Sequence, residues 1–582
     1  MSMLKKHIDG IDSKLILKNI GSQVIEKIAF STYMRWANFD LEYIRPIRWL
    51  VSLFDEEVVP FKILNVVSDR YSRGHRFLGH QKLEIKKADQ YETSLKKEFV
   101  IVDSDKRKQI IVDQLKDLAK KNNWVLKIDQ NLLEEVNNIV EYPTAFAGSF
   151  DKKYLQLPDI VLITSMRDNQ RFFYVTDQQG ALLPYFVSVR NGDSNYLQNV
   201  VSGNEKVLVA RLEDAEFFYN EDLKRSIDYF VKKTDHLVFH EKIGSMTQHM
   251  QRVEEIALSL SSQLKLDKNE TEDLVRASEI YKFDLNTAMV GEFSELQGKM
   301  AGIYAEKFGE NKQVSAALGE QYLPDSSEGD LPKSKLGALL SLSDKLDQIF
   351  AFFSIGQVPK GSNDPYGLRR AALGIVRIIK EFSFDFSLNK LVSDISKNSL
   401  DKECFSKLKK TYTSESNLNS IIDFIVDRIR QVENNTRYDI LDTVLTKTET
   451  GNILSLFKSI GLLKKHADDS DFRDVIESLS RVQNLSKKNT EYKPIDETLF
   501  VNDSEKNLYA ASLKLAQQKD IVDDPEDFYQ KLASLKNVIN DYFQENMIMD
   551  NDEKIRVNRL SQLSLLNSYI SKLGSLNKLI IK

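Results

Sequence analysis

The sequence predicts a multidomain protein that is mainly α-helical, with an α+β region at its N-terminal end. Three observations favour this fold class. A chain of 582 residues with ordinary globular composition suggests roughly four domains. Short apolar runs suited to strands occur mostly before about residue 240. From about residue 245 onward, apolar residues recur three and four positions apart, which is typical of amphipathic helices.

The N-terminal region is predicted to alternate strands and helices. Residues 107–123 predict a helix with Ile111, Leu115 and Leu118 on one face. The apolar runs predict strands at 98–103, at 160–165 and within 171–192, where two strands flank a turn at Gln179 and Gly180.

The remaining chain is predicted to be helical, with helices over residues 252–266, 335–353, 532–543 and 560–573. The 335–353 helix is apolar on most sides, so we expect it to be buried with Asp344 and Asp347 on it. Buried carboxylates need partners, which predicts an ion-pair network. The candidate cations are Arg369, Arg370 and Arg377. Polar, proline-containing linkers are predicted at 319–335 and 486–500.

Composition excludes several classes of protein. A net charge of -5 means that nucleic acid could be held only through local basic patches. The one cysteine, Cys404, excludes a disulfide within the chain and fits a cytoplasmic protein. The opening residues lack the apolar core of a signal peptide, and no apolar run is long enough to predict a membrane span. Phosphate-binding and dinucleotide-binding glycine motifs are missing, so no ATP site is predicted on this chain.

An arginine-rich region within residues 35–80 is the first candidate site. Arginine presents a planar fork of donors that fits phosphate oxygens, Gly74 and Gly79 could let the backbone approach a ligand, and nearby aromatic rings could stack on bases. The candidate residues for phosphate or nucleic-acid contact here are Arg45, Arg48, Arg70, Arg73, His75 and Arg76. The alternative is a structural role, with internal carboxylate partners Asp40, Glu42 and Asp69.

An ordered series of segments extends over nearly the whole chain and resembles the beta subunit of bacterial heterotetrameric glycyl-tRNA synthetase. It includes "YIRPIRWLVSLF", "SRGHRFLG", "VEYPTAFAGSFDKKYLQLP", "ARLEDAEFFYNEDL", "MVGEFSELQGKMAGIYA", "NDPYGLRRAALGIVRII" and "DYFQENMIMDNDEKIRVNRLSQLSLL". Members of this family usually begin with a segment like "IGTEELP", which we expect to be missing here because the chain opens with "MSMLKKHIDGIDSK".

The resemblance implies four regions. Residues 1–240 would be similar to a module of the phenylalanine synthetase beta chain, and 241–400 to a helical HD-like domain. Residues 401–490 would form a helical connection, and 491–582 an anticodon-binding-like helical bundle. In the last region the anticodon-contact candidates are Phe543, Arg556, Asn558 and Arg559, with a core position for Phe543 and local pairing for the polar three as the alternative.

The HD-like region is predicted to lack a metal site. A working HD site needs several histidines beside aspartates, and residues 250–465 contain no histidine. Asp284 and Asp344 are the predicted remnants of such a site. We therefore expect a fold without hydrolase chemistry, although a metal-dependent phosphohydrolase and a stand-alone RNA-binding scaffold are the rival interpretations.

The family also implies a division of labour. This chain would bind tRNA(Gly), whereas the alpha subunit would carry the aminoacylation site and use ATP and Mg. The two would form an alpha2-beta2 tetramer, a glycine–tRNA ligase of cytoplasmic protein biosynthesis. No catalytic residue, metal or cofactor is expected on this chain.

Overall fold

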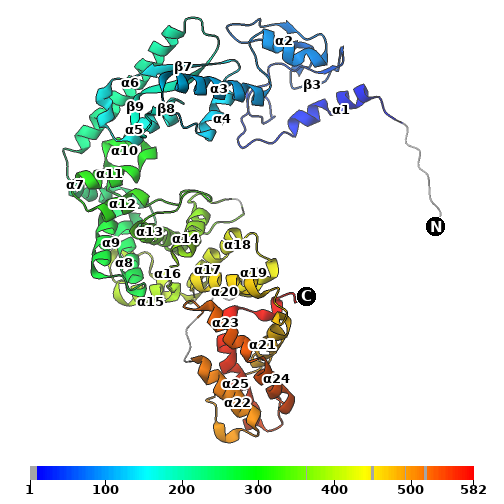
Figure 1. The fold of residues 1–582 in the computed structure, drawn as a ribbon, viewed down its shortest axis with the longest axis vertical. Coiled ribbons are helices and arrows are strands. Elements are labelled where there is room, and N and C mark those ends of the chain that lie inside the picture. Colours follow the sequence, from blue (N-terminus) through cyan, green and yellow to red (C-terminus); the bar gives the residue numbers. More distant parts are fainter. Residues whose placement is uncertain (1–9, 362, 447–450, 492, 517–520, 582) are drawn as a thin grey trace. The chain divides into compact units, whose positions relative to one another are not determined.

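The computed structural model describes residues 10–361, 363–446, 451–491, 493–516 and 521–581, so most of the opening "MSMLKKHIDG" lies outside the described residues. The chain separates into two compact units, Met1–Asn220 and Glu221–Lys582 (Figure 1). The finer boundaries predicted at 240, 400 and 490 stay predictions. Among the described residues, no helix has the length and apolarity needed to cross a membrane.

The first unit combines helices with short antiparallel sheets. Its helices are α1 (Ser13–Glu26), α2 (Tyr91–Lys97), α3 (Ser104–Asn122), α4 (Gln130–Ile139), α5 (Asp159–Thr164) and α6 (Leu197–Asp222), the last of which reaches into the second unit. Its strands are β1 (Leu53–Phe54), β2 (Glu57–Val58), β3 (Lys62–Ile63), β4 (Val66–Val67), β5 (Tyr71–Ser72), β6 (Leu83–Glu84), β7 (Pro143–Ser149), β8 (Phe173–Thr176) and β9 (Leu182–Asn191).

A three-stranded antiparallel sheet, in the order β7-β9-β8, organises the main core of this unit. Helices α3 and α4 lie beside it (Figure 1) and contribute Ile111, Leu115 and Val136 to a buried cluster with Phe173 and Val187 of the sheet. The two strands around the predicted turn and the predicted helix over 107–123 are therefore confirmed as β8, β9 and α3.

Two predicted strands are wrong. Residues 160–165 form α5 and the start of a following π-helical turn, because Pro158 and Asp159 begin a helix whose Val161 and Leu162 are fully buried. A short run of consecutive apolar residues, here 160–163, fits a buried helix as well as a strand. Residues 98–103 connect α2 to α3 and form no strand in the described structure, although the amide of Ile101 donates to Glu141 O at 2.9 Å.

The second unit is helical apart from the hairpin of β10 (Val238–His240) and β11 (Gly244–Ser245). Its first helices are α7 (Ile227–Lys233), α8 (Met246–Gln263), α9 (Lys268–Ile280), α10 (Ala288–Glu292), α11 (Lys299–Lys307), α12 (Lys312–Glu320), α13 (Lys335–Ser354), α14 (Leu368–Phe382), α15 (Leu388–Asn398), α16 (Lys409–Thr413), α17 (Glu415–Val426) and α18 (Ile429–Val432). The chain continues through α19 (Tyr438–Leu445), α20 (Ile453–His466), α21 (Phe472–Ser486), α22 (Asp503–Ala516), α23 (Pro525–Ser534), α24 (Lys536–Glu545) and α25 (Glu553–Ile570). The mainly α fold class is confirmed.

Local sequence signals set the beginnings of the helices that carry the central site. Ser245 and Asp267 form capping boxes with Gln248 and Glu270, so α8 and α9 begin there. Ser334 accepts from the amide of Gly337 and starts α13, which is buried along most of its length as predicted.

The two predicted linkers are irregular but well anchored. Residues 321–334 join α12 to α13, and their carbonyl groups accept hydrogen bonds from Ser341 and Arg377. Beyond α21, Asp496 exchanges two hydrogen bonds with Asn558 of α25 at 2.8 and 3.0 Å. Both segments therefore pack against the helices that follow them.

Candidate functional site

The arginine loop, residues 70–80, is held in one conformation by backbone hydrogen bonds. The amide of Gly74 donates to His80 O at 2.8 Å, and the amide of His75 donates to Glu98 O at 2.8 Å. The buried ring of His75 accepts from the amides of Phe77 and Leu78 through Nδ1 at 3.3 Å. His75 therefore shapes this loop from the inside.

The two glycines of the loop have a packing role. A β-carbon on Gly74 would lie 2.7 Å from Glu98 Cβ, and one on Gly79 would lie 2.5 Å from Glu98 O. Each glycine thus lets the arginine loop approach the chain at Glu98. The close backbone approach that both glycines permit in the structure is to Glu98.

The exposed side of the loop combines arginines with aromatic rings. The guanidinium of Arg73 lies 4.6 Å from the ring centroid of Trp49, which is 43% exposed. The guanidinium of Arg76 lies 5.5 Å from the centroid of Phe77, which is 82% exposed. Cationic donors and accessible rings side by side can contact phosphate and stack on a base at the same time.

The other arginines of this region divide between the two interpretations. Arg45 and Arg48 are exposed, as an RNA contact requires. Arg70 is half-buried and donates to Glu56 O at 3.0 Å, and Arg35 pairs with Glu42 at 3.0 Å, as the structural alternative expects.

Most of the anticodon-contact candidates are occupied inside the C-terminal helices. Arg559 is buried and donates to Glu505 Oε1 at 2.7 Å and to Asp550 Oδ2 at 3.0 Å. Asn558 is buried and exchanges two hydrogen bonds with the backbone of Asp496, and Phe543 is 7% exposed. Arg556 is half-buried and donates to Asp550 O at 3.0 Å. These positions match the alternative of core packing and local pairing.

Sequence reasoning missed a cation on the surface of the same helices. The guanidinium of Arg481, on α21, lies 4.2 Å from the ring centroid of Phe543. It lines a pocket of about 400 Å³ with Lys536 and Asn540 of α24, and with Asp474, Glu477 and Ser478. Only the pairing of two distant helices brings these side chains together, so spacing in the sequence gave no signal.

A buried charged cluster lies between α8 and α13. His249 contacts Asp347 Oδ2 through Nδ1 at 2.7 Å and Asp344 Oδ1 through Nε2 at 2.9 Å. Arg252 makes a bidentate pair with Asp347 at 2.8 and 2.9 Å. The ammonium of Lys282 lies 3.4 Å from Asp344 Oδ1. The predicted ion-pair network around the two aspartates is therefore present.

The partners expected for these aspartates were wrong. Arg369 donates to Gly361 O, and Arg377 donates to Ser327 O and Gly329 O. Arg370 lines a neighbouring pocket instead of pairing with either aspartate. A buried helix is covered on several sides, and here α8 supplies His249 and Arg252 while the segment after α9 supplies Lys282, so the cations do not come from α14.

The cluster shifts the protonation of its members. Burial opposes the charged ring, but bonds to Asp344 and Asp347 outweigh it and raise the pKa of His249 above its usual value. Burial alone would raise the pKa of both carboxyls, but the positive charges of Lys282, Arg252 and His249 hold them well below their usual range. The cluster is thus a set of compensated charges.

These residues do not fit a metal centre. Both nitrogens of His249 face carboxylates, Arg252 occupies Asp347, and Lys282 sits beside Asp344 where a cation would need open coordination. In the described part of the chain, no group of three or more His, Cys, Asp or Glu side chains could hold a metal ion. No hydrolytic step through a metal is derived for this site.

Asp284, the other predicted remnant, is fully buried beside the cluster. Its Oδ2 accepts from the amide of Gly298 at 2.6 Å, and its Oδ1 has no hydrogen-bond partner among the described residues. Burial raises the pKa of Asp284 to about 6. An ionised Asp284 at neutral pH therefore costs stability.

The Asp284→Asn variant should reveal this cost as a change in pH dependence. The unfolded carboxyl titrates near 3.8, so the wild type loses stability as pH rises from about 4 to about 6, by up to about 3 kcal/mol for two pKa units. Asparagine keeps an acceptor for Gly298 and removes the titration. We expect a gain of about 1–2 kcal/mol at pH 7.5 after the cost of an unpaired amide, and no gain at pH 4. Urea unfolding at both pH values measures it, with the exposed Asp330→Asn as control; equal effects at both pH values would contradict it.

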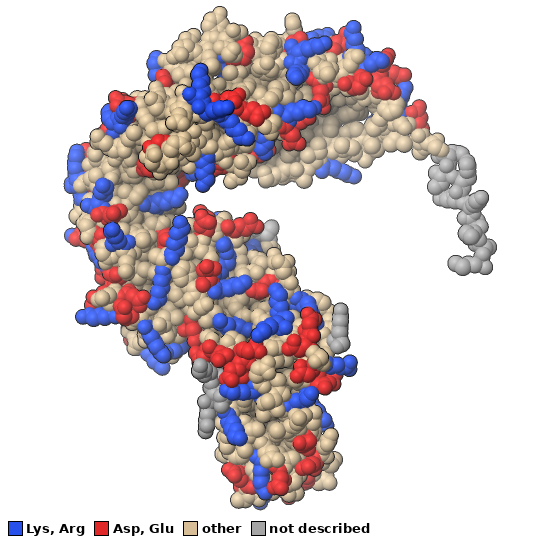
Figure 2. All heavy atoms as spheres, in the orientation of Figure 1, with Lys and Arg blue, Asp and Glu red and all other residues tan. Residues whose placement is uncertain are grey.

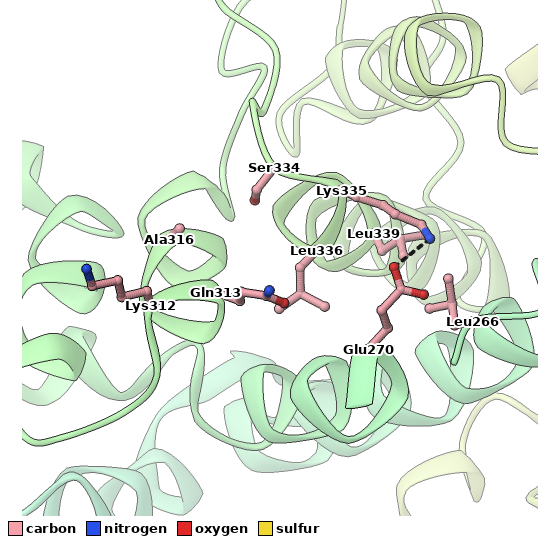
Figure 3. Close-up of a pocket in the computed structure, with 9 residues that line it drawn as sticks. All are labelled: Leu266, Glu270, Lys312, Gln313, Ala316, Ser334, Lys335, Leu336 and Leu339. Carbon is pink, nitrogen blue, oxygen red and sulfur yellow. Dashed lines mark hydrogen bonds and ion pairs between the residues drawn. The ribbon is translucent and has the colours of Figure 1, made fainter. Parts of the chain in front are cut away.

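A second pocket, of about 370 Å³, lies between α9, α12 and α13 (Figure 3). Leu266, Leu336 and Leu339 form its apolar lining, and Lys335 pairs with Glu270 at 2.8 Å across it. Glu270 and Lys335 are thus paired with each other, and Lys312 is the other charged residue of the lining. On the face drawn in Figure 2, lysine and arginine side chains alternate with acidic ones, which agrees with a near-neutral surface and local cationic patches.

Two protein families match the chain, one over its first 446 residues and one near its C-terminal end. The family described as the glycyl-tRNA synthetase beta subunit matches residues 1–446. The family described as the DALR anticodon binding domain matches residues 475–576, which include Arg559 and Glu505 and all residues of the α21–α24 pocket except Asp474.

Individual relatives match nearly all of this chain in sequence. The chain is 58% identical over 583 residues to the glycine–tRNA ligase beta subunit of Oenococcus oeni, covering 100% of this chain and 84% of that protein. It is 46% identical to the corresponding subunit of Leuconostoc mesenteroides, with the same coverage. It is 48% identical to that of Lactiplantibacillus plantarum, over 96% of this chain and 80% of the relative. Because the family match covers residues 1–446 and the sequence identity to these subunits reaches 58%, the chain belongs to the glycyl-tRNA synthetase beta-subunit family.

Proposed function

We propose that this chain is the tRNA-binding subunit of a glycyl-tRNA synthetase that works in the cytoplasm with a separate catalytic alpha subunit. The observation that carries the proposal is the family match over residues 1–446 followed by an anticodon-binding domain over residues 475–576. The alpha subunit would bind ATP, Mg and glycine, and two copies of each chain would form the enzyme. Supporting this division, the sequence has no nucleotide-binding glycine motif.

The mechanism follows from holding tRNA at more than one place. The arginine loop would contact the RNA backbone and stack on a base, and the C-terminal helices would hold the anticodon region. Fixing a tRNA so that its 3′ end reaches the partner's site converts an encounter between separate molecules into a positioned reaction. Such positioning can lower the barrier by several kcal/mol, up to about 7–11 kcal/mol in the best intramolecular cases.

The central helical region would be a scaffold without hydrolase chemistry. An HD-like fold is proposed for residues 241–400 on the family resemblance, with Asp284 and Asp344 as its remnants. The ion pairs of Arg252 and Lys282 support a structural role, because they use the carboxylates that a metal would need. In the C-terminal domain, Arg481 is exposed and is therefore a more accessible candidate for anticodon contact than the half-buried Arg556.

Replacing Arg73 and Arg76 together with alanine should weaken tRNA binding. Each lost phosphate contact removes counterion release, so the slope of log K against log salt should become shallower by about 1.5 for two contacts. Fluorescence anisotropy with labelled tRNA(Gly) at several salt concentrations measures this. Because both side chains are exposed, the double variant should fold normally.

The control is Lys116→Ala with Lys120→Ala on the exposed face of α3, which removes the same charge from the same unit. We expect the control to keep the wild-type slope to within experimental error. An unchanged slope in the Arg73 and Arg76 variant, or an equal change in the control, would remove the arginine loop from the RNA interface.

A further inference from the structure

A polar pocket of about 490 Å³ opens beside the charged cluster in the second unit. Its walls come from α8, α13 and the start of α14, together with the segments 282–297 and 322–325. Neither the arginine loop nor the C-terminal helices contribute to it. Its charged lining residues are His249, Lys282, Asp325, Asp344, Lys345 and Arg370.

Cationic side chains outnumber the acidic ones in this lining, with Lys282, Lys345 and Arg370 facing Asp325 and Asp344. Asp344 is already engaged by His249 and Lys282. Among the described residues, the hydrogen-bond acceptors of the buried Lys345 ammonium are uncharged: Ser341 Oγ at 2.8 Å, and Tyr322 O and Leu323 O at 3.2 Å. The exposed guanidinium of Arg370 makes no hydrogen bond or ion pair within the described part of the chain. Asp325, exposed at the rim, is the remaining acid of the lining.

Burying a lysine without a hydrogen-bonded carboxylate is costly, and the attraction of Asp344 for the Lys345 ammonium is weaker than the cost of burial. Burial lowers the pKa of Lys345 to about 8, so the ammonium is held charged at neutral pH against desolvation. A bound anion would relieve this. Lys282, also buried, lies 3.8 Å from the ring centroid of Tyr322 in the same lining.

The arrangement selects among anions. A terminal phosphate carries about two negative charges and three free acceptor oxygens, enough to face buried ammonium groups and a guanidinium fork together. A phosphodiester within a nucleic-acid backbone carries one charge, and its two substituents would prevent it from reaching lysines that are about 5% exposed. The rings of Phe239, Tyr322 and Tyr366 also line the pocket and provide apolar surface for a planar group attached to the phosphate.

We propose that this pocket binds the terminal phosphate of a phosphorylated ligand, with Arg370 at its mouth and Lys345 at its floor as the principal contacts. The ligand is a small phosphate monoester; the other source of the same group is the 5′-phosphate of an RNA. The site goes beyond the proposed tRNA-binding function and shares no residue with the surfaces assigned to it.

Isothermal titration calorimetry on the full chain tests the site with inorganic phosphate, AMP and adenosine. We expect phosphate and AMP to bind and adenosine, which lacks the phosphate, not to bind. Arg370→Ala should weaken AMP binding at least about tenfold, because it removes a charge-assisted contact. Arg370 is exposed and unpaired in the described structure, so this variant should fold.

The matched control is Arg369→Ala, the neighbouring arginine, whose guanidinium donates to Gly361 O and does not line the pocket. It should bind AMP as the wild type does. Lys345→Met, which removes the floor charge, should weaken binding as well. The proposal is overturned if the wild type binds neither phosphate nor AMP, if Arg370→Ala binds AMP like the wild type, or if Arg369→Ala is weakened equally.

Competition identifies the source of the phosphate. We expect AMP to stay bound when tRNA with or without its 5′-phosphate is added, which assigns a small ligand. Displacement only by 5′-phosphorylated tRNA assigns the RNA end to the same pocket. Loss of AMP binding would not affect glycylation with the alpha subunit, so failure of this proposal and failure of the proposed function are distinguishable.

Discussion

Arg252→Ala should destabilise the second unit by about 3–5 kcal/mol. Arg252 is fully buried, and its guanidinium is bidentate to Asp347, with a third bond to Cys404 O at 3.3 Å. Its removal leaves Asp347 buried with only His249 as a charged partner, and also leaves a cavity where a large side chain lay. A typical domain is stable by about 5–15 kcal/mol, so this loss approaches the limit of folding.

Urea unfolding followed by circular dichroism measures the effect, and Gln251→Ala on the same helix is the control. Gln251 is exposed, so its truncation should change stability by less than about 0.5 kcal/mol. A loss below about 1 kcal/mol in Arg252→Ala would show that the pair with Asp347 does not support this fold. The expected loss should also grow as pH rises above the pKa of His249, because deprotonation removes the remaining cation; its pKa is raised, so its stabilisation is present at low pH and is lost through neutral to alkaline pH.

Arg559→Leu should destabilise the C-terminal helices by a similar amount, about 3–5 kcal/mol. Arg559 of α25 is 5% exposed and pairs with the fully buried Glu505 of α22. Glu505 also accepts from the amides of Val501 and Asn502, so its charge has a fixed position. Without the arginine, the carboxylate of Glu505 stays buried without its cationic partner, and the ion pair between α22 and α25 is lost. Any loss of tRNA binding in this variant should follow from unfolding.

A double variant separates the charge from the packing. Arg559→Leu with Glu505→Gln leaves no buried charge and keeps the acceptor for the two amides, so we expect it to be more stable than Arg559→Leu alone. The exposed Lys554→Ala on α25 serves as the surface control. If Arg559→Leu unfolds like the wild type but loses tRNA affinity, the internal role of Arg559 is contradicted and a direct RNA contact is indicated.

Much of the helical fold follows from sequence periodicity, and its failures have physical causes. The 335–353 stripe became α13, and the turn at Gln179 and Gly180 became the β8–β9 connection. The strand predicted at 160–165 was wrong because four consecutive apolar residues, 160–163, show neither the strand nor the helix period. Strand β7 was missed because its "PTAFAGS" is poor in β-branched residues and depends on pairing with β9, about forty residues later.

The central cluster shows where a sequence-only search falls short. A search for histidines over residues 250–465 begins one residue after His249, which is the histidine that contacts both aspartates. The signal was present: His249 and Arg252 stand three apart on the same face of α8 as Val253 and Ile256. Polar side chains on a buried face require partners, but only the packing of α8 on α13, about 95 residues away, shows which ones.

The arginine loop illustrates the opposite limit. Its residue types predicted phosphate contact, and in the structure Arg73 and Arg76 lie over exposed aromatic rings. His75 and the two glycines, by contrast, pack inside the loop and hold its conformation. One short segment thus contains both framework and candidate contact residues. Only three-dimensional contacts separate the two roles, because they alternate along the sequence.

The most direct test of the central claim is a glycylation assay with purified components. The chain is incubated with ATP, Mg, glycine and tRNA(Gly), first alone and then with an added alpha subunit, and charged tRNA is quantified. The account predicts no charging by the chain alone and rapid charging when both subunits are present. Charging by the chain alone, or no dependence of charging on this chain when the alpha subunit is supplied, would contradict it.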